Sequence, residues 1–159
     1  NAASIPVLKY ALDIIFNFFV VTTIVLVICG ISGHLWLGVI GITVMPLLRY
    51  FSGGLHLRSS LACSYLSAVM IVLAVHTYHF VPYWNWGFIL NAIALLLVVI
   101  YAPAGNKGHS RLDEKHYPKL KLVASLIVLA NFALGSSLIA ILFVMQGVTL
   151  PLTKLEKPA

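Results

Sequence analysis

Hydrophobic residues gather in six runs that are separated by short polar connections. The runs are Ala11–Cys29, Leu35–Leu48, Leu61–Val75, Trp84–Tyr101, Leu120–Leu134 and Leu138–Leu150. A helix that crosses a bilayer perpendicularly needs about 20 apolar residues, with roughly 17 tolerated. The first and fourth runs reach this length alone, whereas the other four need flanking residues or a locally thinner bilayer. The pattern predicts an all-α, polytopic membrane protein with six transmembrane helices.

The basic residues support this topology because, with six spans, all ten of them fall on one side of the membrane. They are Lys9, Arg49, Arg58, Lys107, Arg111, Lys115, Lys119, Lys121, Lys154 and Lys157. The opposite connections, Gly30–His34, His76–Tyr83 and Gly135–Ser137, contain neither Lys nor Arg. Since cytoplasmic loops carry an excess of basic residues, both termini and the connection before the third run are predicted to be cytoplasmic.

Composition agrees with a membrane protein, since 61% of the 159 residues are hydrophobic and only 9% are charged. A soluble domain is about half apolar and about a quarter charged. We therefore expect one domain over residues 1–159, embedded in the lipid bilayer of the cell membrane. The net charge of +6 follows from the topology, and no nucleic-acid partner is predicted. The two cysteines, Cys29 and Cys63, make no disulfide framework.

The connection between the second and third runs carries candidate chemistry. It holds His56 and Cys63, seven residues apart, after the Gly53-Gly54 pair. A thiol beside a base is the minimum equipment for nucleophilic acyl transfer, provided that the two side chains meet. Packing of the cysteine and interfacial anchoring of the histidine are the alternatives. No second Cys or His stands near enough in sequence to complete a metal site.

A helix that begins at this connection would make the cysteine reactive. Ser59 or Ser60 is a suitable N-cap. With Ser60 as the cap, Cys63 takes the third helical position, where free N–H groups and the helix dipole favour the thiolate. Its own N–H is then a candidate oxyanion donor. Arg49 and Arg58 add positive potential nearby.

The histidine needs a bend in the chain to reach the thiol. Residues seven apart in one helix share a face but stand about 10 Å apart along the axis. We expect Gly53-Gly54 to let the backbone curl so that His56 folds back over the helix start; pairing across a dimer interface is the alternative. Asp13, costly in lipid unless paired, is expected to pair with Lys9 or Arg49, or else to orient His56.

Together these residues resemble a known family. Arg49, the Gly53-Gly54 pair, His56 and Cys63, in this order and spacing, are similar to the signature of the accessory gene regulator B (AgrB) family of membrane cysteine endopeptidases. Tyr101-Ala-Pro-Ala104, followed by a basic loop, is also similar, and the resemblance extends from Lys9 through Lys157. It departs at the N-terminus: members usually carry an amphipathic stretch there, whereas about nine residues precede the first run, so we expect that stretch to be missing from this chain.

The resemblance implies a function in Gram-positive quorum sensing. Cys63 would attack an AgrD-type precursor peptide near its C-terminal tail, with His56 moving the proton, and a precursor Cys or Ser would then close a thiolactone or lactone ring. The resemblance implies no cofactor, and it implies that the protein forms a homodimer. Supporting or substrate-binding roles are expected for Arg49, Gly53, Gly54, Arg58, Ser60 and Asp13. The alternatives are a peptide exporter and a non-catalytic adaptor that recruits partners through Gly105–Lys119.

Overall fold

The structure is a computed structural model that describes residues 5–55, 59–104 and 116–153. Over these ranges the chain is all-helical, with no element of sheet beyond one isolated backbone bridge. The helices are α1 (Ile5–Ile31), α2 (Leu35–Ser52), α3 (Ser60–Thr77), α4 (Phe88–Tyr101), α5 (Tyr117–Leu134) and α6 (Ser137–Leu152). A turn of 3-10 helix, η1 (Tyr78–Phe80), and a π-helical segment, η2 (Tyr83–Gly87), connect α3 to α4. The predicted all-α class is confirmed.

Most helices are longer than the apolar runs that predicted them. α2, α3 and α5 each have 18 residues, because polar residues at their ends continue the helix. Arg49 and Ser52, for example, belong to the last turn of α2 rather than to a loop. As a result five segments are long and apolar enough to cross a membrane, and α6, with 16 residues, is shorter. The chain is thus a multi-pass membrane protein, and residues 5–55, 59–104 and 116–153 hold five helical segments of spanning length and one shorter apolar helix.

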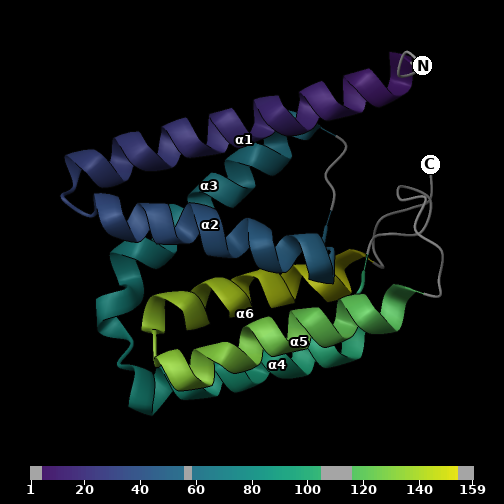
Figure 1. The fold of residues 1–159 in the computed structure, drawn as a ribbon. Helices are drawn as coiled ribbons and strands as arrows, with labels where there is room; N and C mark the ends of the chain where they lie inside the picture. Colours follow the sequence, from purple (N-terminus) through teal and green to yellow (C-terminus); the bar gives the residue numbers. More distant parts are fainter. Residues whose placement is uncertain (1–4, 56–58, 105–115, 154–159) are drawn as a thin grey trace.

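The short helix lies in the interior of the bundle. α6 packs against α4, α2 and α3, and Figure 1 shows it between α2 and the pair formed by α4 and α5. Nine of its residues are buried. A helix covered by neighbours on most sides has little lipid-facing surface that must match the thickness of the bilayer, which explains how a shorter helix is accommodated here.

The buried side chains form two clusters, and α2 and α6 contribute to both. The first joins these helices to α1 and α3 and includes Val25, Met45, Ile71 and Leu142. The second joins them to α4 and α5 and includes Leu48, Val98, Val128 and Phe143. α2 and α6 therefore hold the two halves of the bundle together.

The helices alternate in direction, so that one end of the bundle collects the basic residues. The start of α1, the end of α2, the start of α5 and the end of α6 lie at the same end (Figure 1). This end, called the basic end below, carries Arg49 in α2 and Lys119 and Lys121 in α5. The opposite end carries exposed aromatic side chains, Trp36, Phe80, Trp84 and Trp86, as expected at a membrane–water interface.

Candidate active site

α2 ends at the two glycines, which the structure fixes against the chain that follows α4. Gly53 has φ 73° and ψ −150°, a conformation available essentially only to glycine. The N–H of Gly54 donates to the carbonyl of Ala104 at 3.1 Å, and the N–H of Ala104 donates to the carbonyl of Ser52 at 2.9 Å. A Cβ on Gly53 would collide with the carbonyl oxygen of Ala104. The glycine pair is thus a close approach of two backbones, and the expected curl that would bring His56 over the helix start lies outside the described residues.

A buried side chain of α6 holds the same segment from its other side. Gln146 is fully buried, and its Nε2 donates to the carbonyl of Gly53 at 2.8 Å. A Cβ on Gly54 would lie 2.8 Å from this Nε2 and 2.9 Å from Oγ1 of Thr149. Gln146 therefore positions the chain just before His56, a role that the sequence analysis missed. The available signal was an amide within an apolar helix, where burial is costly unless the amide is hydrogen-bonded.

Arg49 connects this segment to the thiol. Its Nη2 donates to the carbonyl of Leu55 at 2.5 Å and to Sγ of Cys63 at 3.2 Å. Both acceptors touch the same nitrogen, so the Leu55 carbonyl and the sulfur are no farther apart than two hydrogen-bond lengths. The guanidinium thus bridges the chain just before His56 and the side chain of Cys63. The structure therefore brings Arg49, the glycine pair and Cys63 together, as the sequence predicted.

Cys63 lies in the first turn of α3, one position later than the Ser60 cap would place it. The N-cap is Ser59, whose Oγ accepts from the N–H of Ala62 at 3.4 Å. Cys63 is therefore the fourth helical residue, and its N–H already donates to the Ser59 carbonyl at 3.2 Å. The expectation that this N–H would serve an oxyanion is wrong, because the helix uses it. By helix geometry, the N–H groups of Ser60 and Leu61 have no partner within the helix.

A contact from α1 supports the start of α3. Nδ2 of Asn17 donates to Oγ of Ser60 at 2.6 Å, so Ser60 accepts from a neighbouring helix instead of capping its own. Oδ1 of Asn17 is buried and has no partner within the described part of the chain. The sequence analysis missed Asn17, although an amide between Phe16 and Phe18 stands out in an apolar run.

The remaining predicted residues do not join this group in the described ranges. Asp13 is exposed on α1, and within residues 5–55, 59–104 and 116–153 no ion pair joins it to Arg49, whose Nη2 binds Leu55 and Cys63 instead. Its expected pairing with Lys9 or His56 involves side chains that lie outside the description. His56 and Arg58 themselves lie outside the described residues. The residue before His56 is Leu55, whose carbonyl is held beside the sulfur by Arg49.

The Arg49 contact gives a first prediction. Arg49→Lys keeps the charge but replaces the planar guanidinium with an ammonium of different reach and donor geometry, and Arg49→Gln removes the charge as well. A hydrogen bond to a charged group is worth about 1.5–3 kcal/mol, so we expect the rate of Cys63 alkylation by iodoacetamide to fall at least about tenfold in Arg49→Gln and less in Arg49→Lys. Lys119→Gln, at an exposed cation of the basic end, is the control. Equal rates in all four proteins would contradict the assigned role of Arg49.

Comparison with known proteins identifies the same family. Residues 2–153 match the family described as accessory gene regulator B (AgrB). Proteins named AgrB-like from Listeria innocua serovar 6a and Listeria welshimeri serovar 6b are each 34% identical over 91 residues, which are 55% of this chain and 44% of each relative. An AgrB-like protein of Halalkalibacterium halodurans is 28% identical over 149 residues, 92% of this chain and 71% of that protein. The matched region thus spans a little under half of each Listeria protein. No solved structure matches the chain significantly.

Proposed function

Because this chain belongs to the accessory gene regulator B (AgrB) family, we propose that it is a membrane cysteine endopeptidase of quorum sensing. Its substrate is an AgrD-type precursor peptide, from which it removes the C-terminal tail and whose remaining part it cyclises. The observation that carries the proposal is the contact of Arg49 with both Sγ of Cys63 and the carbonyl before His56. A buried structural cysteine would not need a guanidinium on its sulfur.

The first step is acyl transfer from the precursor to the enzyme. His56 takes the proton from the Cys63 thiol, and Arg49 stabilises the resulting thiolate. The sulfur attacks the scissile carbonyl, forming a C–S bond and an oxyanion that the free N–H groups of Ser60 and Leu61 would stabilise. The oxyanion collapses, the C–N bond breaks, and His56 returns the proton to the departing amine of the tail. A thioester to Cys63 remains.

The second step returns the enzyme to its starting state. A thiol or hydroxyl of the precursor loses its proton to His56 and attacks the thioester carbonyl. The new C–S or C–O bond closes the ring, the bond to Cys63 breaks, and the sulfur is protonated again. With a precursor thiol this step exchanges one thioester for another of nearly equal energy, so no external energy source is needed. Water must be kept from the thioester, and a site recessed between helices favours that.

The proposed chemistry takes place at the cytoplasmic face of the cell membrane. The site lies at the basic end of the bundle, and cytoplasmic loops carry the excess of Lys and Arg. A precursor made in the cytoplasm would then reach Cys63 without crossing the bilayer.

The proposal is tested by co-expressing the protein with candidate precursors from its genomic neighbourhood and following them by mass spectrometry. We expect the wild-type protein to release the tail and to yield an adduct at Cys63 that hydroxylamine cleaves, as thioesters are cleaved. His56→Ala should slow tail release by about 10²–10⁴-fold, the usual contribution of a general base. His79→Ala, at an exposed histidine of the opposite end, is the matched control. Tail release that is unchanged in His56→Ala would refute the assigned base, and no release by the wild-type protein from any precursor would refute the protease.

A further inference from the structure

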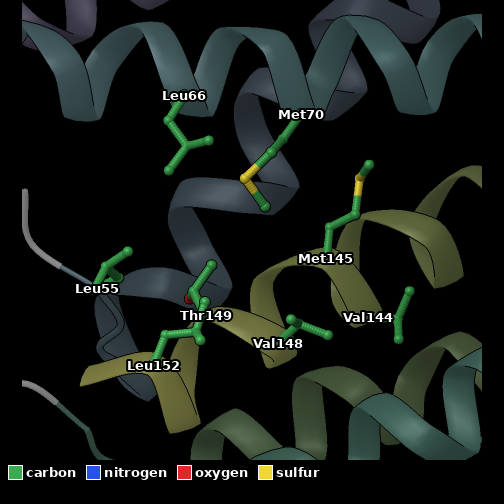
Figure 2. Close-up of a pocket in the computed structure, with 8 residues that line it drawn as sticks. All are labelled: Leu55, Leu66, Met70, Val144, Met145, Val148, Thr149 and Leu152. Atoms are coloured by element: carbon green, nitrogen blue, oxygen red, sulfur yellow. The ribbon is translucent and has the colours of Figure 1, made fainter. Parts of the chain in front are cut away.

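An apolar groove lies between α3 and α6 at the basic end (Figure 2). Its volume is about 320 Å³, at the lower end of the range for ligand pockets in proteins. Apart from Thr149, every side chain that lines it is apolar. Leu66 and Met70 point from α3 toward Met145 and Leu152 of α6, and Leu55 lies at one end (Figure 2).

The groove is continuous with the candidate active site. Leu66 and Met70 follow Cys63 by three and seven residues on α3, and residues at these spacings share one face of a helix. The groove wall on α3 therefore begins about one helical turn, roughly 5 Å, beyond the sulfur. At the end of the groove, Leu55 is the residue whose carbonyl shares the Arg49 nitrogen with Cys63. When a substrate peptide places its scissile carbonyl at the sulfur of Cys63, the side chain of the residue that supplies this carbonyl is within reach of the groove.

We propose that this groove is the specificity subsite for the precursor residue that supplies the scissile carbonyl, and that it selects a bulky apolar side chain there. The inference rests on the proposed function and deepens it. The acyl part of the substrate is the part that must stay bound after the tail has left, because the ring closes on it. A subsite that holds its side chain keeps the thioester carbonyl in place for the second step.

The lining explains the expected selectivity. A charged or strongly polar side chain would lose its hydration in a groove that offers almost no polar partner, which is costly. A Leu, Met or Phe side chain would instead gain free energy by leaving water. Met70 and Met145 face the groove from opposite walls, and flexible thioether side chains adapt to different apolar shapes. We therefore expect the groove to select apolar side chains as a class, rather than one residue type.

A filling substitution tests the subsite. Val148 lines the groove and is 49% exposed, so Val148→Phe should fill part of it. Val69→Phe is the matched control, because Val69 is 52% exposed on α3 and does not line the groove. With purified protein in liposomes, kcat/KM is measured for precursors with Leu, Ala or Lys at the residue before the cut.

The expected outcome is a change of preference. Wild-type protein and Val69→Phe should process the Leu precursor about tenfold or more faster than the Ala precursor, as expected for burying two or more additional carbon groups, and the Lys precursor slowest. Val148→Phe should reduce the Leu-over-Ala ratio to near one while its Cys63 alkylation rate stays unchanged. A second measurement uses a photoreactive leucine at the same precursor position with Cys63→Ala, and it should give a cross-link within Leu66–Met70 or Met145–Leu152.

The outcomes separate this inference from the proposed function. Processing of all three precursors at one rate, or sensitivity only to the residue after the cut, would overturn the subsite and leave the protease standing. Cross-links to lipid alone would show that the groove belongs to the bilayer and would also overturn it. Failure of the wild-type protein to process any precursor would overturn the proposed function, and the subsite with it.

Discussion

Replacing Cys63 with alanine is expected to abolish tail removal, with a loss of about 10⁴-fold or more, the scale seen when a nucleophile is deleted from a catalytic group. The physical reason is that acyl transfer needs an atom that can form and release a bond to the scissile carbonyl. In the described part of the chain, Sγ of Cys63 is the sulfur that Arg49 contacts. The measurement is the ratio of released tail to intact precursor by mass spectrometry at matched protein levels.

The chain provides its own control for this prediction. Cys29, the other cysteine, is fully buried in α1, and it packs so closely on α2 that a Cβ on Gly38 would lie 3.1 Å from its Sγ. Cys29→Ala should therefore retain processing and lose only modest stability, since it removes one buried atom. Cys63→Ser, which keeps a smaller and poorer nucleophile in place, should be far slower than wild type. Normal tail release by Cys63→Ala would end the acyl-enzyme mechanism.

The second large effect is expected from Gly53→Ala. A Cβ at this position would meet the backbone of Ala104, which cannot turn away as a flexible side chain could. The φ of 73° and ψ of −150° add backbone strain for any other residue. We expect a loss of unfolding free energy on the order of 3 kcal/mol, in the range of the most damaging single substitutions, together with loss of processing. Thermal unfolding in detergent and the tail-release assay measure the two effects.

Gly33→Ala separates strain from collision. Gly33 has a similar φ of 75°, but a Cβ there would meet no atom within 4 Å. This substitution should cost about 1 kcal/mol, the penalty of left-handed backbone alone, and should leave tail release intact. Equal destabilisation by both substitutions would show that contact with Ala104 contributes little.

The sequence predicted the helices because they depend on local patterns, and it also placed Arg49 near Cys63, which the hydrogen bond between them confirms. Apolar runs and one-sided basic residues indicated the class and the alternating direction of the helices. The lengths of most helices were underestimated, because the runs were ended at the first polar residues. A hydrogen-bonded helix in fact continues through Arg49 to Ser52.

The contacts that hold the site together could not be predicted in the same way. Gln146 reaches the Gly53 carbonyl across 93 residues, and Asn17 reaches Ser60 across 43. A polar residue in an apolar run indicates that a partner exists, since burial without one is costly, but nothing in the local pattern names that partner. The choice of Ser59 over Ser60 as the cap has a similar origin, because the hydroxyl of Ser60 accepts from α1.

The bond between Gln146 and Gly53 also has a consequence for biosynthesis. α2 and α3 are translated well before α6, so a nascent chain that already holds the arginine and the cysteine still lacks the amide that fixes Gly53. Ribosomes that stall or terminate before α6 would release chains in which no Gln146 side chain holds the segment around Gly53. If the proposed function holds, competence to cut would thus be acquired only once α6 has entered the membrane.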